Sequence, residues 1–124
     1  MMNYERKKVK QLFEELRLQK KWTFPKTRER LEAPKQHGVY IIYRGKKVMH
    51  VGRTLRGKKG LYQRLKNHLY GNSSFTKKKF NGSGWKLRKG FKYQCLKVRS
   101  DRKRALLEAY AIGVLCPVHI GLGK

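Results

Sequence analysis

Apolar residues near the N-terminus recur with the spacing of an amphipathic helix. Four of them share one helical face, at i, i+3, i+4 and i+7: Val9, Leu12, Phe13 and Leu16. With Asn3 available as a cap, we expect a helix over residues 3–20. Its opposite face is rich in Lys and Arg, and is either solvated or a surface that also contacts phosphate. Residues 23–36 contain two prolines, which predicts a connecting segment with room for a short helical turn.

The middle of the chain changes to a β-type pattern. Residues 38–44 (GVYIIYR) and 46–53 (KKVMHVGR) are short β-rich runs joined by Gly45, which predicts a hairpin. After a basic loop bracketed by glycines, three leucines recur at i, i+4 and i+8: Leu61, Leu65 and Leu69. They predict a helix that Gly71 can end.

The last third combines a polar segment, a strand and a helix. Residues 71–84 are polar and glycine-rich, which indicates a loop with a short helix around residues 77–79. Residues 91–98 alternate as a half-buried strand, and a further strand is expected before it at residues 85–88. Ser100-Asp101 then caps a final helix.

This order of elements predicts an α+β fold. We expect a small antiparallel sheet of about three strands flanked by helices, with an extra helix at the N-terminus. At 124 residues and 39% hydrophobic content, the chain fits one folding unit. Within it, residues 1–36 form the N-terminal helix and its connection, and residues 37–124 form the main domain.

The formal net charge of +26 points to a polyanionic partner. Nucleic acid is the first expectation and an anionic membrane surface the second. No apolar run approaches the roughly 18 residues of a membrane span, and the N-terminus lacks the apolar region of a signal peptide. We therefore expect a cytoplasmic protein that does not insert into a membrane. The two cysteines cannot form a disulfide framework.

Acidic residues are scarce where basic residues are abundant. The last 92 positions hold 23 Lys or Arg but only two carboxylates, Asp101 and Glu108. Glu108 lies in the apolar run of residues 105–115, which predicts a buried helix. A buried carboxylate needs a partner, which is either Arg104 one turn earlier or a metal ion.

Five residues on the predicted hairpin and helices carry candidate chemistry: Tyr40, His50, Arg64, His68 and Glu108. They comprise a phenol and an imidazole that can handle protons, a guanidinium for a phosphate oxygen, a further imidazole, and a hard oxygen ligand. This set suits metal-assisted phosphodiester hydrolysis. Acids are too few for a pair of close carboxylates, and no Ser-His-Asp set is available.

The spacing of these residues resembles that of the GIY-YIG nuclease domain. Gly38-Val39-Tyr40 is followed after nine residues by His50-Val51-Gly52, then by Arg64-x-x-x-His68 and the distant helical Glu108. The resemblance extends from residue 38 to about residue 119. It implies a compact domain with a small antiparallel sheet that cuts phosphodiester bonds with one divalent ion, usually Mg²⁺, although another such as Mn²⁺ is open.

The resemblance also implies a role for each residue. Glu108 would hold the metal, and Tyr40 would be the general base or orient the attacking water. Arg64 would clamp the scissile phosphate, and His68 would orient groups or donate a proton near it. Such contacts stabilise the charge that builds up on phosphate oxygens in the transition state.

Two positions depart from the family pattern. His50 stands where the second motif normally begins with tyrosine, and Pro117-Val118-His119 stands where the family usually has Asn after proline. Since an imidazole titrates near neutrality, His50 remains an alternative to Tyr40 as the base. His119 is either a phosphate contact in place of Asn or a structural histidine.

We therefore expect an Mg²⁺-dependent endonuclease that acts on DNA. The expected nucleic-acid contacts are Arg53, Arg56, Lys58, Lys59, Lys77, Lys78, Lys79 and His119. Two alternatives stay open: a non-catalytic nucleic-acid-binding module, and a nuclease for RNA. Specificity would come from loops, substrate shape, a protein partner or a dimer. Four aromatic residues either stack on unpaired bases or belong to the core: Tyr62, Tyr70, Phe75 and Trp85.

Overall fold

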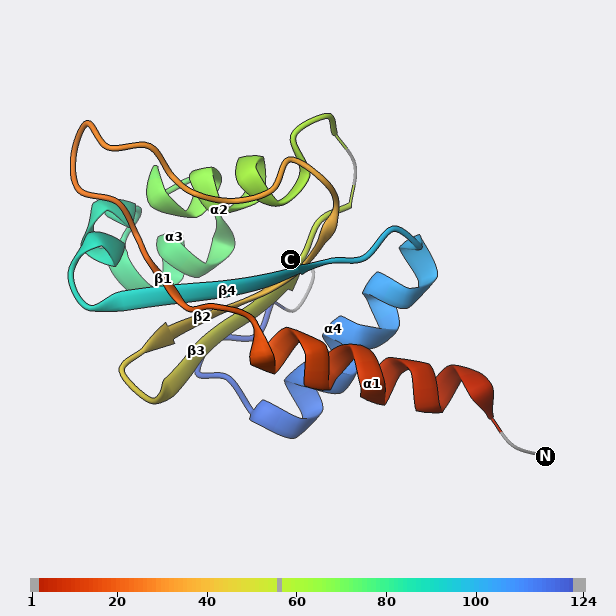
Figure 1. Cartoon of the computed structure of the whole chain (residues 1–124). Helices are drawn as coiled ribbons and strands as arrows, with labels where there is room; N and C mark the ends of the chain where they lie inside the picture. The colour runs from red at the N-terminus through yellow and green to blue at the C-terminus, as the bar shows by residue number, and fades with distance from the viewer. Residues whose placement is uncertain (1–2, 56, 122–124) are drawn as a thin grey trace.

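A computed structural model describes residues 3–55 and 57–121 of the chain. Its elements, in order, are α1 (Tyr4–Leu18), β1 (Trp22–Thr23), β2 (Gly38–Arg44), β3 (Lys47–Arg53), α2 (Gly60–Leu69), α3 (Ser74–Phe80), the 3₁₀ helix η1 (Gly84–Arg88), β4 (Phe91–Lys97) and α4 (Asp101–Leu115). The predicted hairpin and the predicted helices around Leu65 and Glu108 are all present (Figure 1). No helix of the described ranges is long and apolar enough to cross a bilayer.

The sheet has four strands in the order β1-β4-β2-β3, and all its pairings are antiparallel. The α+β prediction is therefore confirmed, with one more strand than expected. The additional strand is β1, which pairs Trp22 with Tyr93 at one edge. A strand of two residues has no alternation from which a sequence pattern could reveal it.

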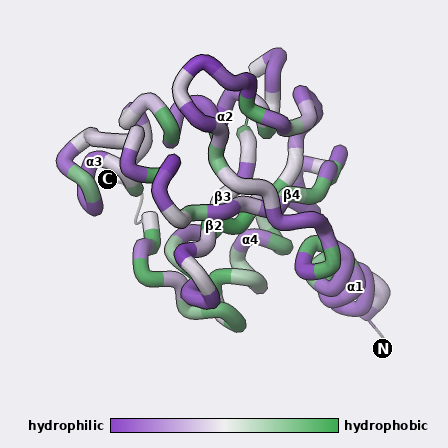
Figure 2. Tube along the Cα trace, turned by 60° about the vertical axis from the view of Figure 1, so that its left-hand side comes forward, coloured by the Kyte–Doolittle hydropathy of each residue, from purple (hydrophilic) through white to green (hydrophobic). Residues whose placement is uncertain are grey.

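Helices cover both faces of the sheet (Figure 1). Because side chains alternate along a strand, Tyr40 and Ile42 of β2 pack with α2 and α3, whereas Val39 and Ile41 pack with α1 and α4. Strand β2 lies in the middle and is buried at every position except Arg44. In Figure 2 the hydrophilic colour dominates α1, whose apolar side alone reaches the core.

Side-chain and glycine caps explain where the helices begin and end. The Oδ1 atom of Asn3 accepts a hydrogen bond from the Arg6 amide at 3.1 Å, and Ser100 Oγ accepts one from the Lys103 amide at 3.2 Å. Gly71 follows α2 with a φ of +78°, a conformation that suits glycine. The predicted caps and the predicted end of α2 are thus confirmed.

Two predictions about local structure were wrong. Residues 85–88, expected as a strand, lie in η1, because the segment turns tightly against the end of α2. Helix α4, expected to be buried on nearly every side, is an outer helix with one inward face: Leu107 is fully buried, whereas Val114 is 52% exposed. A run of apolar residues shows that a helix forms, but not how many neighbours surround it.

Candidate active site

Tyr40 lies at the centre of a buried hydrogen-bond network. Its hydroxyl is 2.6 Å from Nε2 of His68 and accepts a hydrogen bond from Nε of Arg64 at 3.3 Å. The phenol ring crosses Gly52, its partner on β3, so closely that a Cβ there would lie 2.3 Å from the Tyr40 hydroxyl oxygen. Only glycine at position 52 leaves room for this ring.

Two residues that sequence reasoning missed, Ser73 and Thr76, support the Nδ1 side of the His68 ring. Nδ1 of His68 lies 2.6 Å from Oγ of Ser73, which lies 2.9 Å from Oγ1 of Thr76. All three side chains are buried. Ser73 also caps α3 by accepting from the Thr76 amide, and this capping pattern is the one signal that could have singled it out.

Burial determines the protonation of this network. It raises the pKa of Tyr40 to about 12, although the nearby Arg64 guanidinium opposes the change. It also lowers the pKa of His68 well below 6.5, and Arg64 acts in the same direction. Tyr40 is therefore a neutral phenol that donates to Nε2 of a neutral His68. The remaining imidazole proton then lies on Nδ1 and is donated to Ser73.

His50 occupies an interior position next to this network. Its ring stacks on Phe75 with centroids 4.9 Å apart and an interplanar angle of 9°. Burial lowers the pKa of His50 to about 3, to which His119 and Arg64 contribute. Nδ1 of His50 faces His119, whereas the Tyr40 hydroxyl contacts Arg64 and His68, so the contacts favour Tyr40 over His50 as the candidate base.

His119 lies in a buried position beside His50. The C-terminal segment lies along β3, where the His119 amide donates to the Met49 carbonyl at 2.9 Å. Its Nδ1 lies 3.0 Å from Nδ1 of His50, and the side chain is buried. Its Nε2 has no hydrogen-bond partner in the described part of the chain. Pairing with β3 covers the ring and favours the structural alternative, and a nucleic-acid contact at His119 stays a prediction.

Glu108 pairs with a different arginine from the one expected. Its Oε1 accepts a hydrogen bond from Nε of Arg53 at 2.9 Å, and both side chains are about one-third exposed or less, at 26% and 31%. Arg104 is buried and donates instead to Asp101 and to three backbone carbonyls: those of Thr54, Val98 and Arg99. The interpretation of Glu108 as the partner of Arg104 was therefore wrong.

A cleft of about 720 Å³ gives access to the basic side of this site. The end of β3, helix α2 and the start of α4 line it, with Arg53, Arg64 and Asn67 among the side chains. Glu108 is adjacent to the cleft because it forms an ion pair with Arg53, which lines it. Glu108 is also near enough to Tyr40 to raise the pKa of that phenol. The structure thus brings Tyr40, Arg64, His68 and Glu108 into one region.

The other expected nucleic-acid contacts lie on the surface. Lys58 and Lys59 are exposed in the loop before α2, and Lys77, Lys78 and Lys79 are exposed on α3. Arg56 lies outside the described residues. Whether these side chains contact nucleic acid stays a prediction.

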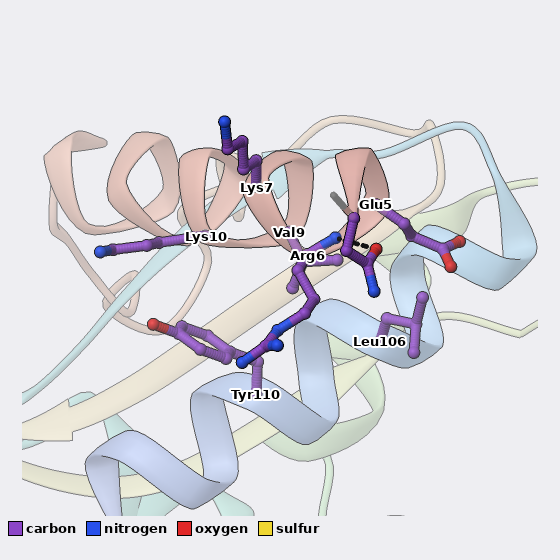
Figure 3. A pocket seen from close by; sticks show the side chains of 8 residues that line it. Glu5, Arg6, Lys7, Val9, Lys10, Leu106 and Tyr110 are labelled. Carbon is purple, nitrogen blue, oxygen red and sulfur yellow. Dashed lines mark hydrogen bonds between the residues drawn. The ribbon is translucent and has the colours of Figure 1, made fainter. Parts of the chain in front are cut away.

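A second hollow, of about 740 Å³, lies between α1 and α4 (Figure 3). Val9, Leu106 and Tyr110 form its apolar part, and Arg6 and Lys10 extend beside it. It contains no member of the Tyr40 network, so we do not place the reaction there.

The donor set near Glu108 fits one kind of metal site. Mg²⁺ retains several waters and is often bound through one or two carboxylates together with substrate phosphates. Glu108 supplies one partly exposed carboxylate, which suits such a water-rich site. A site enclosed by protein ligands does not fit, because no cluster of three or more His, Cys, Asp or Glu with that geometry occurs in residues 3–55 and 57–121.

Acid should destabilise the protein through His50. Its pKa is 6.5 in the unfolded chain and about 3 in the fold, so the unfolded state binds the proton first. The contribution of the neutral His50 ring to the free energy of unfolding is complete above pH 6.5, and it is lost progressively as the pH falls toward 3. The slope for one such group is about 1.4 kcal/mol per pH unit. Burial lowers the pKa of His68 as well, so His68 acts in the same direction.

Urea unfolding at several pH values, with wild type beside His50→Phe, tests this prediction. The groups that face His50 are Tyr40, Arg64, His68 and His119, and the variant retains all of them. As the pH falls from about 6 to about 4, the free energy of unfolding should decrease less per pH unit for the variant than for wild type. Parallel stability curves would contradict the assignment.

Comparison with known proteins finds similarity in structure. No protein-family model matches the chain, and no curated protein matches it in sequence. The N-terminal GIY-YIG endonuclease domain of UvrC from Thermotoga maritima, bound to its catalytic magnesium, superposes with a TM-score of 0.53 at 20% identity, covering 98% of this chain and 100% of that one. A point mutant of that domain, with its divalent cation, gives 0.53 and 20%, covering 98% and 99%.

The superposition extends over nearly the whole chain and includes the four-stranded sheet with its flanking helices. The sequence motifs lie on the elements that the resemblance implied: Tyr40 on β2, His50 on β3, Arg64 and His68 on α2, and Glu108 on α4. The chain has the fold of a GIY-YIG endonuclease domain.

Proposed function

We propose that the chain is a divalent-metal-dependent endonuclease that hydrolyses phosphodiester bonds in DNA. The observation that carries the proposal is the Tyr40 hydroxyl held between Arg64 and His68, at 3.3 and 2.6 Å. A phenol between a guanidinium and a neutral imidazole can exchange a proton with water beside an anionic substrate. The UvrC domain, which shares this fold, is an endonuclease domain with a catalytic divalent cation, and this supports the assignment.

Tyr40 is the proposed general base, and His68 makes that role feasible. A phenol with a pKa of about 12 is protonated at neutral pH, so it takes a proton from water only if it gives up its own. Nε2 of His68, which is unprotonated, can accept the phenolic proton as the Tyr40 oxygen receives one from the attacking water. The imidazolium that forms is hydrogen-bonded through Nδ1 to Ser73.

Arg64 is the proposed clamp on the scissile phosphate. It lines the cleft and donates to Tyr40, whose side chain is fully buried. Movement of the guanidinium onto a phosphate oxygen would form a stronger, charge-assisted hydrogen bond and would uncover the phenol for water. Arg64 would thereby couple substrate binding to exposure of the base.

Glu108 would hold the divalent cation. When bound there, the cation would supply Lewis-acid stabilisation of the charge that develops on the phosphate. Because Arg53 occupies one oxygen of Glu108, its guanidinium has to release that oxygen before a cation can use it. A substrate phosphate in the same cleft is a suitable new partner for Arg53.

Metal removal provides the direct test of the proposed function. Purified protein should nick supercoiled plasmid, or cut single-stranded or branched DNA, with Mg²⁺ and should leave every substrate intact in EDTA. Binding, measured by anisotropy, should persist in EDTA because the charge of +26 supplies it. Binding without cleavage of any DNA or RNA substrate would identify the chain as a non-catalytic module. Cleavage of RNA alone would identify a ribonuclease.

A further inference from the structure

The four aromatic residues that were candidates for base stacking divide into two groups in the structure. Phe75 is fully buried against His50, and Tyr62 packs partly against the core. Tyr70 and Trp85, in contrast, are 59% and 52% exposed. Single exposed apolar side chains are ordinary on a protein surface, so the case for a binding surface depends on what surrounds these two rings.

Basic side chains accompany these exposed rings. The Lys66 Nζ atom lies 5.8 Å from the ring centroid of Tyr70, and it lies at the same distance from that of Tyr62. The Nζ atoms of Lys86 and Lys89 lie 6.0 and 5.5 Å from the Trp85 ring. Every ring on this surface therefore has a cation beside it.

The two groups of side chains come from adjoining parts of the fold. The C-terminal end of α2 contacts the start of η1 in space, although α3 lies between them in the sequence. A Cβ at Gly84 would lie only 2.2 Å from the His68 carbonyl oxygen. Tyr70 and Trp85 thus project from backbone segments in direct contact. We call the exposed side chains of these two adjoining segments together the aromatic–lysine surface, defined by Tyr62, Lys66, Tyr70, Trp85, Lys86 and Lys89.

Helix α2 connects this surface to the proposed catalytic residues. Its leucines face the core, and Arg64 and His68 face Tyr40. Tyr62, Lys66 and Tyr70 recur at i, i+4 and i+8 and so lie along a different side of the helix. Arg64 precedes Lys66 by two positions and Tyr70 by six, and this spacing places the aromatic–lysine surface on a side of α2 that points away from Arg64.

We propose that the aromatic–lysine surface binds unpaired bases of single-stranded nucleic acid. This binding of bases does not depend on the proposed nuclease function. Every base has a face that stacks on an aromatic ring, but in a duplex these faces are covered by neighbouring bases. The lysines attract phosphate in either form, so the exposed rings are what distinguishes single strands from duplex.

The two tryptophans of the chain provide a matched pair of variants. Trp22 is also partly exposed, at 36%, and has the Nζ atom of Lys20 at 3.9 Å from its ring, but it lies on β1 and belongs neither to α2 nor to η1. Trp85→Leu removes the proposed stacking ring, and Trp22→Leu removes the control ring. Each variant also leaves one tryptophan as a fluorescent reporter. Circular dichroism checks that both variants fold.

The probes are labelled oligothymidylate and a blunt duplex, titrated in EDTA so that cleavage plays no part. Trp85→Leu should weaken binding of the single strand about ten-fold and binding of the duplex less than about two-fold. Trp22→Leu should leave both affinities unchanged. Oligothymidylate should quench the fluorescence of Trp85 in Trp22→Leu protein but not that of Trp22 in Trp85→Leu protein.

Equal losses for single strand and duplex, or no quenching of Trp85, would overturn the proposal and leave the rings as a surface for another kind of partner. The outcome is separate from that of the proposed function. Cleavage without a role for Trp85 would refute only the stacking surface, and quenching without cleavage of any substrate would refute only the nuclease.

Discussion

Replacement of Glu108 by glutamine is expected to abolish cleavage, with a loss of about a thousand-fold or more. The amide keeps the size of the side chain but removes the one carboxylate proposed to hold the divalent cation. A bound cation contributes several kcal/mol to stabilisation of a phosphoryl transition state, and about 4 kcal/mol corresponds to a thousand-fold in rate. Initial rates of plasmid nicking at saturating Mg²⁺ measure the effect.

Arg53→Ala is the matched control for Glu108→Gln. Both variants remove the ion pair between Arg53 and Glu108, but only Arg53→Ala keeps the carboxylate. Calorimetric titration with Mn²⁺ in the absence of nucleic acid should show tighter binding to Arg53→Ala than to wild type, and no binding to Glu108→Gln. Full cleavage activity in Glu108→Gln, or metal binding equal to that of wild type, would exclude Glu108 as the ligand.

Tyr40→Phe is expected to slow cleavage by about a hundred-fold to ten-thousand-fold, the usual contribution of a general base. The variant keeps the ring that packs over Gly52 but removes the oxygen between Arg64 and His68. It also leaves Nε2 of His68 without a partner, which should lower the free energy of unfolding by about 1–3 kcal/mol. Single-turnover rates and urea unfolding separate the two effects.

Tyr43→Phe is the control for this substitution. Tyr43 lies on the same strand with its side chain on the opposite face of the sheet, where its hydroxyl donates to Gln94. Tyr43→Phe therefore removes a buried hydroxyl and should reduce stability, but it should leave the cleavage rate of folded protein near that of wild type. Equal rates for the two variants would show that the Tyr40 hydroxyl takes no part in the reaction.

Most secondary structure in this protein follows from local patterns. The β-rich runs of residues 38–44 and 46–53 predict β2 and β3 through their composition, and the leucine repeat predicts α2 through the period at which its apolar residues recur. Strand β1 and helix η1 were not predicted. Their form depends on contacts with β4 and with the end of α2, which are distant in sequence.

The candidate site also has features that the sequence determines and features that only the tertiary structure determines. Its residue types and their order along the chain are properties of the sequence alone, and they were sufficient to indicate the GIY-YIG fold and a phosphodiester substrate. The sequence also determined the charge of +26 and the scarcity of acids that makes Glu108 conspicuous. These features require no knowledge of which elements are neighbours.

The tertiary structure alone decided the partners of these residues. It paired Glu108 with Arg53 of β3 instead of Arg104 on its own helix, and it placed Ser73 behind His68. It also buried His119 against β3. Each of these contacts except the one between Ser73 and His68 joins residues more than fifty positions apart. Sequence patterns report which face of an element is buried, whereas hydrogen bonds and pKa shifts depend on which atoms the packed sheet and helices bring within a few ångströms.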